Sequence, residues 1–218
     1  MTGAVQHLLV FGATGPTGLQ IVEQALARGL RVTAFVRDPA KLTLEHPRLH
    51  TVIGDVGDPE SIDTALATKP DAVVSALGMF HKQPETWLSE GTARIVEAMK
   101  KYGVHRIVIV SSLGAGDSRG QGNLIARGVQ KFILRHVLDD KTRQEQLLRD
   151  SGLDWTSFRP PQLTNDSTPS EDIVLWTDKP PRQKLIWKVS RATVARYVLD
   201  AIQEHQHSHS AVNMSQGV

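Results

Sequence analysis

The sequence predicts an α/β protein: a Rossmann-like, doubly wound parallel sheet with helices on both faces. Short apolar runs rich in β-branched residues alternate with segments of helical period from the N-terminus to about Pro160. The runs 71–77 and 104–110 are almost continuously apolar, which is typical of parallel strands buried on both faces. Single helices between the strands supply the crossover connections that parallel pairing requires.

The first part of the chain gives three strands and two helices. Runs of β-branched and apolar residues predict strands at His7–Phe11, Arg31–Val36 and Leu49–Ile53. Apolar residues at helical spacing predict a helix over 17–28. A second helix is predicted over 59–67, because Asp58 can cap its first turn and Pro59 suits its first position.

The same alternation continues to the paired prolines Pro160 and Pro161. In order, the predicted strands and helices are 71–77, 84–101, 104–110, 129–150 and 153–158. Strands and helices therefore alternate through the whole of this region, and one sheet accommodates all of its strands.

A different pattern follows the prolines and predicts a small C-terminal elaboration on the substrate side. Short strands are predicted at Ile173–Trp176 and 184–189, and Ser190 can cap a helix over 191–204. We expect residues 162–189 to form part of the substrate pocket. The polar segment 205–210 is interpreted as a mobile connection.

Length and composition predict a single domain spanning residues 1–218. Lys and Arg number 25 against 23 acidic residues, so the net charge of +2 gives no electrostatic case for nucleic acid. The absence of cysteine excludes disulfides and thiolate ligands, and we expect no metal site. No segment approaches the ~20 apolar residues that span a bilayer. We expect a soluble cytoplasmic protein without a membrane partner, as a monomer or weak homo-oligomer.

A glycine-rich segment joins the first predicted strand to the first predicted helix. Residues 12–18 read GATGPTG and fit the pattern G-x-x-G-x-x-G. Glycines let the backbone approach a diphosphate, and the helix N-terminus offers free N–H groups and partial positive charge. A plain tight turn is the alternative, but the place of the segment after the first strand favours a dinucleotide site. The expected cofactor contacts in this loop are Gly12, Ala13, Thr14, Gly15, Thr17 and Gly18.

Two cations follow the second predicted strand, where NAD-preferring sites usually carry an acidic residue. Arg37 comes directly after the strand, and Lys41 follows four residues later. Together they can hold a 2′-phosphate, and the planar guanidinium of Arg37 suits that group. The alternative is a solvated surface pair, with Asp38 beside Arg37. The pattern predicts NADPH/NADP as the cofactor.

Further contacts are expected at the ends of the third and fourth predicted strands. Asp55 can accept a hydrogen bond from the adenine amino group while Val56 packs on the ring; alternatively, Asp55 serves a turn. Leu77 and Gly78 end the fourth strand at the same edge of the sheet. The glycine would let the chain pass close to the cofactor, although a plain strand-ending turn explains it too.

These residues resemble the atypical short-chain dehydrogenases/reductases of the NmrA-like kind, and most closely the biliverdin-IXβ reductase and flavin reductase (NADPH) family. The matching positions run almost end to end and include Phe11–Gly18, Val36–Asp38, Gly54–Val56, Ser89–Gly91, Ser112, Asp139–Asp140, Ser151–Leu153 and Pro160–Pro161. The resemblance implies NADPH along the carboxyl edge of the sheet, beside Pro160 and Pro161, with Ser112 near the nicotinamide. It further implies hydride delivery to a stacked isoalloxazine or linear tetrapyrrole.

The sequence departs from the wider superfamily at several positions. Lys141 corresponds to its conserved lysine, but Val137 stands where a proton-donating tyrosine would be, which argues against ordinary alcohol–ketone chemistry. The flavin and biliverdin reductases also lack this tyrosine. Gln162 replaces their histidine after the prolines, the loop 113–128 is longer and glycine-rich, and Met79-Phe80 replaces polar residues.

The predicted function is an NADPH-dependent reductase of flavins (FMN, FAD or riboflavin), extending to biliverdin or quinone-like acceptors. The candidate catalytic residues are Ser112 and Gln162, although Ser111 can serve a turn equally well and a loop glutamine can simply face water. One alternative is a non-enzymatic NmrA-like sensor that binds NADP(H). Another is a reductase or isomerase acting on a different small molecule.

A basic stripe is also visible in the predicted helix 129–150 and the residues just before it. Arg127, Lys131 and Arg135 recur every four residues, which places them on one helix face. Such a stripe is usually a solvated face; the alternative is a surface that receives an acidic substrate or a partner.

Overall fold

Eight strands form one sheet in the order β3-β2-β1-β4-β5-β6-β10-β8. The structure is a computed structural model and describes residues 4–78 and 85–218. Neighbouring strands of this sheet are parallel, except that β10 pairs with β8 in the antiparallel sense. The strands are β1 (His7–Phe11), β2 (Arg31–Val36), β3 (Leu49–Ile53), β4 (Ala72–Ser75), β5 (Arg106–Val110), β6 (Asp154–Arg159), β8 (Ile173–Trp176) and β10 (Ser210–Gln216).

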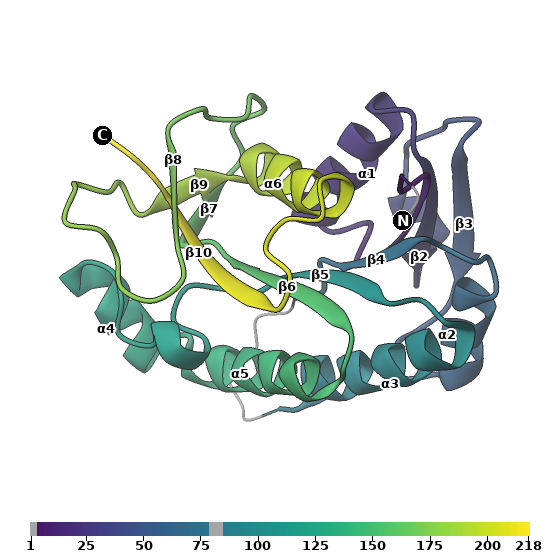
Figure 1. The fold of residues 1–218 in the computed structure, drawn as a ribbon, viewed down its shortest axis with the longest axis horizontal. Coiled ribbons are helices and arrows are strands. Elements are labelled where there is room, and N and C mark those ends of the chain that lie inside the picture. The colour runs from purple at the N-terminus through teal and green to yellow at the C-terminus, as the bar shows by residue number, and fades with distance from the viewer. Residues whose placement is uncertain (1–3, 79–84) are drawn as a thin grey trace.

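Helices cover both faces of the sheet, which confirms the predicted Rossmann-like, doubly wound fold (Figure 1). In Figure 1, α1 and α6 lie on one face, and α2, α3 and α5 lie on the other. The α-helices are α1 (Pro16–Ala27), α2 (Pro59–Leu66), α3 (Trp87–Tyr102), α4 (Leu124–Phe132), α5 (Arg135–Asp150) and α6 (Arg191–Gln203). Two short 3₁₀ turns, η1 (Pro39–Lys41) and η2 (Gly116–Ser118), complete the helical elements of the described residues.

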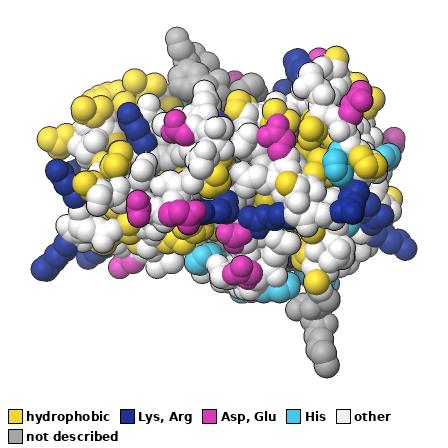
Figure 2. Space-filling view, turned by 90° about the horizontal axis from the view of Figure 1, so that it is seen from above, with side chains coloured by type: hydrophobic (Ala, Val, Ile, Leu, Met, Phe, Trp, Pro, Cys, Tyr) yellow, Lys and Arg dark blue, Asp and Glu magenta, His cyan; other side chains and the backbone are white. Residues whose placement is uncertain are grey.

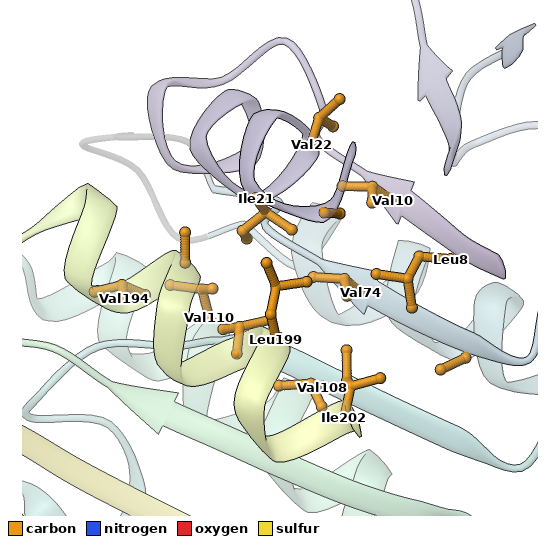
Figure 3. Packing of buried hydrophobic residues seen from close by; sticks show 14 of the residues in the cluster. Leu8, Val10, Ile21, Val22, Val74, Val108, Val110, Val194, Leu199 and Ile202 are labelled. Carbon is orange, nitrogen blue, oxygen red and sulfur yellow. The ribbon is translucent and has the colours of Figure 1, made fainter. Parts of the chain in front are cut away.

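The alternation of side chains along β1 divides the core into two layers. Leu8 and Val10 belong to the cluster beneath α1 and α6, whereas Leu9 and Phe11 belong to the cluster on the opposite face. Figure 3 shows the first layer, where side chains of α1 and α6 pack onto those of β1, β4 and β5. All five residues of β1 are buried, as expected for a central parallel strand.

The order of the strands places a topological switch point between β1 and β4. From β1 the chain builds outward through β2 and β3, and it then returns to add β4 on the other side of β1. Crossovers that diverge in this way leave a crevice at the carboxyl ends of the two central strands. Loops carrying Gly12 and Leu77 lie at that edge.

A small elaboration follows β6, as the sequence predicts. Two three-residue strands, β7 (Gln162–Thr164) and β9 (Lys188–Ser190), pair in parallel as a separate sheet. Of the predicted strand 184–189, only the last two residues belong to a strand, β9. Residue Trp187 precedes β9 with a left-handed φ of +50°.

Two helices differ from the sequence prediction in extent. The predicted helix 129–150 is wrong as a single unit, because the chain turns at Ile133 and Leu134, whose N–H groups both donate to the carbonyl of Val129. This turn separates α4 from α5, so that α4 projects at the end of the molecule (Figure 1). Helix α3 begins at Trp87, and the start predicted at position 84 lies outside the described residues, as do Met79 and Phe80.

The segment 205–210, which its polarity predicts to be a mobile connection, makes several contacts with the sheet. The carbonyl of His207 accepts a hydrogen bond from Thr156 Oγ1 at 2.8 Å, and Arg106 donates to the carbonyl of Gln206 at 3.0 Å. The imidazole of His207 also meets the Phe158 ring edge-on. These contacts join the segment to β5 and β6, and its last residue already belongs to β10.

Candidate cofactor and substrate site

The turn after β1 requires glycine at its first and last positions. Gly12 adopts a φ of +76°, and a Cβ there would lie 2.8 Å from the backbone carbonyl of Ala76. A Cβ on Gly18 would lie 2.0 Å from the carbonyl oxygen of Gly12. The turn is closed by the N–H of Gly15, which donates to the same oxygen at 3.0 Å. Side chains are thus excluded where the backbone must lie closest to a ligand.

Helix α1 begins at this turn with free backbone donors. Gly15 occupies the N-cap position, where it has no side chain to cap the helix, and Pro16 follows in the first turn. Because the first N–H groups of a helix lack intrahelical acceptors, this terminus offers donors and partial positive charge. Thr17 and Gly18 are buried behind the turn. The cradle fits a diphosphate.

A cavity of about 150 Å³ opens at the switch point, in front of the glycine turn. Its wall comes from the loops after β1, β2, β3 and β4, together with the start of α3. The lining residues are Gly12, Thr14, Gly15, Phe35, Val36, Arg37, Val56, Ala76, Leu77, Gly78 and Trp87. We call this space the cofactor cavity. Seven of the fourteen predicted cofactor residues therefore line one space, and the structure adds Phe35, Val36, Ala76 and Trp87 to them.

The two predicted phosphate-binding cations occupy different positions. Arg37 lines the cofactor cavity, and its Nη1 lies 3.9 Å from Oδ2 of Asp55. Lys41 belongs to η1, outside the cavity lining, with its Nζ 3.7 Å from Oδ2 of Asp38. Asp38 also accepts a hydrogen bond from the N–H of Ala40 and so caps η1. The structure brings Arg37 to the cavity and leaves Lys41 beside Asp38.

Asp55 and Val56 have separate roles in the turn after β3. Oδ1 of Asp55 accepts a hydrogen bond from the N–H of Gly57 at 2.7 Å, which supports the turn interpretation of this residue. Val56 is buried and lines the cofactor cavity. Helix α3 approaches Val56 closely, because a Cβ on Gly91 would lie 2.9 Å from Cγ2 of Val56.

The position of α3 is set in turn by Asp140, which is buried on α5. Its carboxylate oxygens accept hydrogen bonds from the N–H groups of Leu88 at 2.9 Å and Ser89 at 3.2 Å. These are free donors at the start of α3, so the carboxylate caps the helix from a neighbouring element. The motifs around Ser89 and Asp140 that carry the family resemblance thus position one wall of the cofactor cavity.

A second cavity, of about 520 Å³, lies at the carboxyl ends of β5 and β6. It lies further along the same edge of the sheet as the cofactor cavity, since β4 separates β1 from β5. Its lining residues are Ser112, Leu113, Asn123, Ile125, Ala126, Val129, Gln130, Leu134, Pro161, Gln162, Ile186, Trp187 and Lys188. We call this space the substrate cavity. Its size lies within the usual range for small-molecule sites.

The two candidate catalytic residues meet in the substrate cavity. Ser112 is partly buried, and its Oγ lies 3.4 Å from the carbonyl of Leu113, a long hydrogen bond. Gln162 is exposed at the rim. Ser111 is buried and does not line this cavity, which distinguishes the two serines. Of the paired prolines, Pro161 lines the wall, while buried Pro160 accepts a hydrogen bond from the N–H of Leu113.

The long loop 113–128 forms one wall of the substrate cavity, and buried charges anchor it. Arg159 and Glu145 are both fully buried, and the guanidinium binds the carboxylate through Nε at 2.9 Å and through Nη2. Arg159 also pairs with Asp117 of η2, and Ser157 donates to Glu145 at 2.9 Å. Burial lowers the pKa of Arg159, but hydrogen bonds and charge from Glu145 and Asp117 raise it overall. None of the predicted site residues belongs to this network.

Lys141 supports the end of β5 from beneath. Its Nζ donates to the carbonyl of Val110 at 3.1 Å, one residue before Ser111. Burial lowers the pKa of Lys141 to about 8, against the opposing effect of the Glu145 and Asp140 charges. Its ammonium group is therefore directed at the backbone of the strand that leads to Ser112.

Comparison with known proteins identifies the class. Residues 12–205 match the family described as NAD(P)H-binding, and the chain belongs to that family. An uncharacterized chloroplastic protein of Arabidopsis thaliana is 32% identical over 96% of this chain and 76% of its own length. Within the described residues, none of the helices combines the length and apolar character needed to cross a bilayer.

Solved structures share the architecture over nearly the whole chain. A short-chain dehydrogenase/reductase from Veillonella parvula, solved with NADP, has a TM-score of 0.79 at 19% identity, covering 97% of this chain and 95% of its own. ChuY, an anaerobillin reductase from Escherichia coli O157:H7, has a TM-score of 0.79 at 22% identity, covering 96% and 97%. At these identities the likeness concerns the fold.

Proposed function

We propose that this protein is an NADPH-dependent reductase that delivers hydride to a flavin, such as FMN, FAD or riboflavin, and also to biliverdin or quinone-like acceptors. The observation that carries the proposal is the pairing of two cavities along one edge of the sheet. A glycine-lined cavity suits a dinucleotide, and a larger cavity lined by Ser112 and Gln162 suits a planar acceptor.

Arg37 supports the choice of NADPH over NADH. Its guanidinium follows β2 at the rim of the cofactor cavity, where a 2′-phosphate would lie. The carboxylate of Asp55, at 3.9 Å, is too distant for a strong hydrogen bond and leaves the guanidinium donors available. A phosphate would then be the better partner.

The substrate cavity supports an aromatic or conjugated acceptor. Leu113, Val129 and Trp187 supply apolar and aromatic wall, and the polar residues of the lining are Ser112, Asn123, Gln130, Gln162 and Lys188. ChuY, which shares the fold, is an anaerobillin reductase, and we propose an acceptor of comparable conjugated character for this protein. We infer that Ser112 and Gln162 bind the carboxamide of the cofactor or a carbonyl of the acceptor, and so orient the two rings.

The proposed chemistry asks little acid–base work of the protein. NADPH, when bound, supplies the hydride, and the proton required by a reduced flavin can come from water. Val137 occupies the place of the superfamily's tyrosine, in agreement with a reaction that needs no phenolic donor. The residues of the two cavities act by placing two rings in contact and limiting other geometries.

The test is to mix the protein with NADPH and, separately, with FMN, riboflavin, biliverdin and a soluble quinone, following the nicotinamide absorbance. Protein-dependent NADPH oxidation with the flavins is the expected result. Tight NADP(H) binding without oxidation by any acceptor would contradict the reductase proposal and favour the NmrA-like sensor. A matched Gly18→Ala variant, whose added Cβ meets the backbone of the cradle, controls for turnover outside the cofactor site.

A further inference from the structure

Helix α4 carries an unusual concentration of exposed apolar side chains. Eight large apolar residues are exposed in the described part of the chain, and half of them lie within residues 124–133. They are Leu124, Ile125, Phe132 and Ile133, of which the first three are at least 79% exposed. Contiguous exposed apolar side chains usually mark a docking surface.

The exposed side of α4 is divided into two parallel strips. At 100° per residue, Leu124, Ile125 and Phe132 fall within an arc of about 100° on the helix, with Leu124 at the border next to Lys131. Arg127 and Lys131 fall on the neighbouring sector, and Arg135 continues that strip at the start of α5. The remaining sector, with Ala126, Val129 and Gln130, faces the substrate cavity, and Ile125 at the edge of the apolar strip also contributes to the lining of that cavity.

The charge of this region has one sign. Residues 119–138 include four Lys or Arg and no Asp or Glu. Elsewhere the two signs are mixed, as Figure 2 shows for the face that it presents. Arg119 is partly neutralised by Asp139 at 2.5 Å. Beside it, Arg127, Lys131 and Arg135 line a further hollow of about 580 Å³ with Phe132. An anionic surface would complement this region.

We propose that α4 docks this protein onto an anionic phospholipid bilayer as a peripheral contact. Apolar side chains of a surface helix insert at the level of the headgroups while flanking Lys and Arg attract anionic lipids. A second copy of the chain fits less well, because a two-fold contact would bring the basic strips of two α4 helices together. The expectation of no membrane partner rests on the lack of a spanning segment, which does not bear on peripheral contact.

The test uses sedimentation of the full chain with vesicles of phosphatidylcholine alone and of an equimolar mixture with phosphatidylglycerol. We expect binding to the anionic vesicles that weakens as salt is raised, since salt screens the basic strip. Each basic residue near such a surface contributes about fivefold in affinity, so the charge reversal Lys131→Glu should weaken binding about thirtyfold. Phe132→Ser should weaken it about tenfold through loss of an inserted ring.

Matched controls separate docking from general effects of charge and hydrophobicity. Lys100→Glu reverses an exposed lysine in the last turn of α3, as Lys131→Glu does in α4. Ile53→Ser removes an exposed apolar side chain on β3. Both controls should bind anionic vesicles like the unaltered protein. Unchanged NADPH binding by all four variants shows that they remain folded.

Three results would overturn the proposal. They are an absence of vesicle binding, equal binding to both lipid compositions, and weakening by the control variants as large as that by the α4 variants. If the protein instead dimerises in solution and Phe132→Ser abolishes the dimer without any vesicle binding, the face belongs to a second copy.

Discussion

Arg37 stands at the rim of the cofactor cavity with its side chain 67% exposed and Asp55 3.9 Å away. The sequence could indicate that cations follow β2, but not which of them faces the cavity. Asp38 decides this locally, because it caps η1 and so turns Lys41 away. The sequence motif for cofactor choice considers only the cations after β2, and it does not include the effect of a nearby carboxylate such as that of Asp38.

Arg37→Ala should raise the Michaelis constant for NADPH about tenfold and leave that for NADH nearly unchanged. The figure is the lower end for one charge-assisted hydrogen bond, because the site is open to water. Lys41→Ala serves as the matched control and should have a smaller effect. Steady-state kinetics with both cofactors makes the comparison, and equal losses with NADPH and NADH would remove Arg37 from this role.

Lys141 is a buried residue of α5 that lies beneath the end of β5, and burial lowers its pKa to about 8. Below that pH the folded protein carries a buried ammonium group, which burial destabilises. Between about pH 8 and 10.5 the unfolded chain keeps the proton that the folded protein has released. The free energy of unfolding contributed by this residue therefore rises with pH across that window.

Lys141→Met should remove this pH dependence. The free energy of unfolding of the variant, minus that of the unaltered protein, should fall by up to about 3 kcal/mol between neutral pH and pH 10.5. Urea unfolding at the two pH values measures the difference, with the exposed Lys100→Met as control. A constant difference between variant and unaltered protein would show that the lysine titrates alike in both states.

At the scale of elements, the buried pair of Arg159 on β6 and Glu145 on α5 links the sheet to η2 through Asp117. Gly116 makes room for the guanidinium, because a Cβ there would lie 2.6 Å from Nη2 of Arg159. Side chains from three separate elements make this network, so no local sequence pattern indicates it. The substrate cavity depends on it, since the same loop carries its wall.

Glu145→Gln should destabilise the protein by about 3 kcal/mol, because it leaves Arg159 buried with a weaker partner. Glu171→Gln also removes a carboxylate paired with an arginine, but Glu171 is 85% exposed, so little change is expected. Urea unfolding at neutral pH compares the two variants. Similar small losses from both would mean that the buried pair does not anchor the loop.

The strands that the sequence predicts best are those with continuous apolar runs. β10 escaped prediction because Asn213 and Ser215 interrupt its apolar residues, although both are fully buried in the sheet. The break between α4 and α5 was missed for a related reason: residues 129–150 keep a helical pattern across the turn. Tertiary contacts decide such cases, and local periodicity does not report them.

At the scale of the whole molecule, the strand order explains why residues distant in sequence meet. The turn after β1 and the loop after β4 adjoin because β1 and β4 are neighbours at the switch point. Ser112 and Gln162 adjoin because β5 and β6 pair in parallel and end at the same edge. The predicted alternation of strands and helices is sufficient to place these loops together. The parts of the substrate cavity that α4 and Trp187 line could not be predicted in this way, because tertiary packing determines their positions.

The central claim is that the cradle formed by Gly12, Gly15 and Gly18 binds a nicotinamide dinucleotide that carries a 2′-phosphate. Calorimetric titration of the unaltered protein with NADPH and with NADH tests it most directly. We expect saturable binding of both cofactors, with the lower dissociation constant for NADPH. Equal or tighter binding of NADH would contradict the 2′-phosphate assignment, and no measurable affinity for either cofactor would contradict the account as a whole.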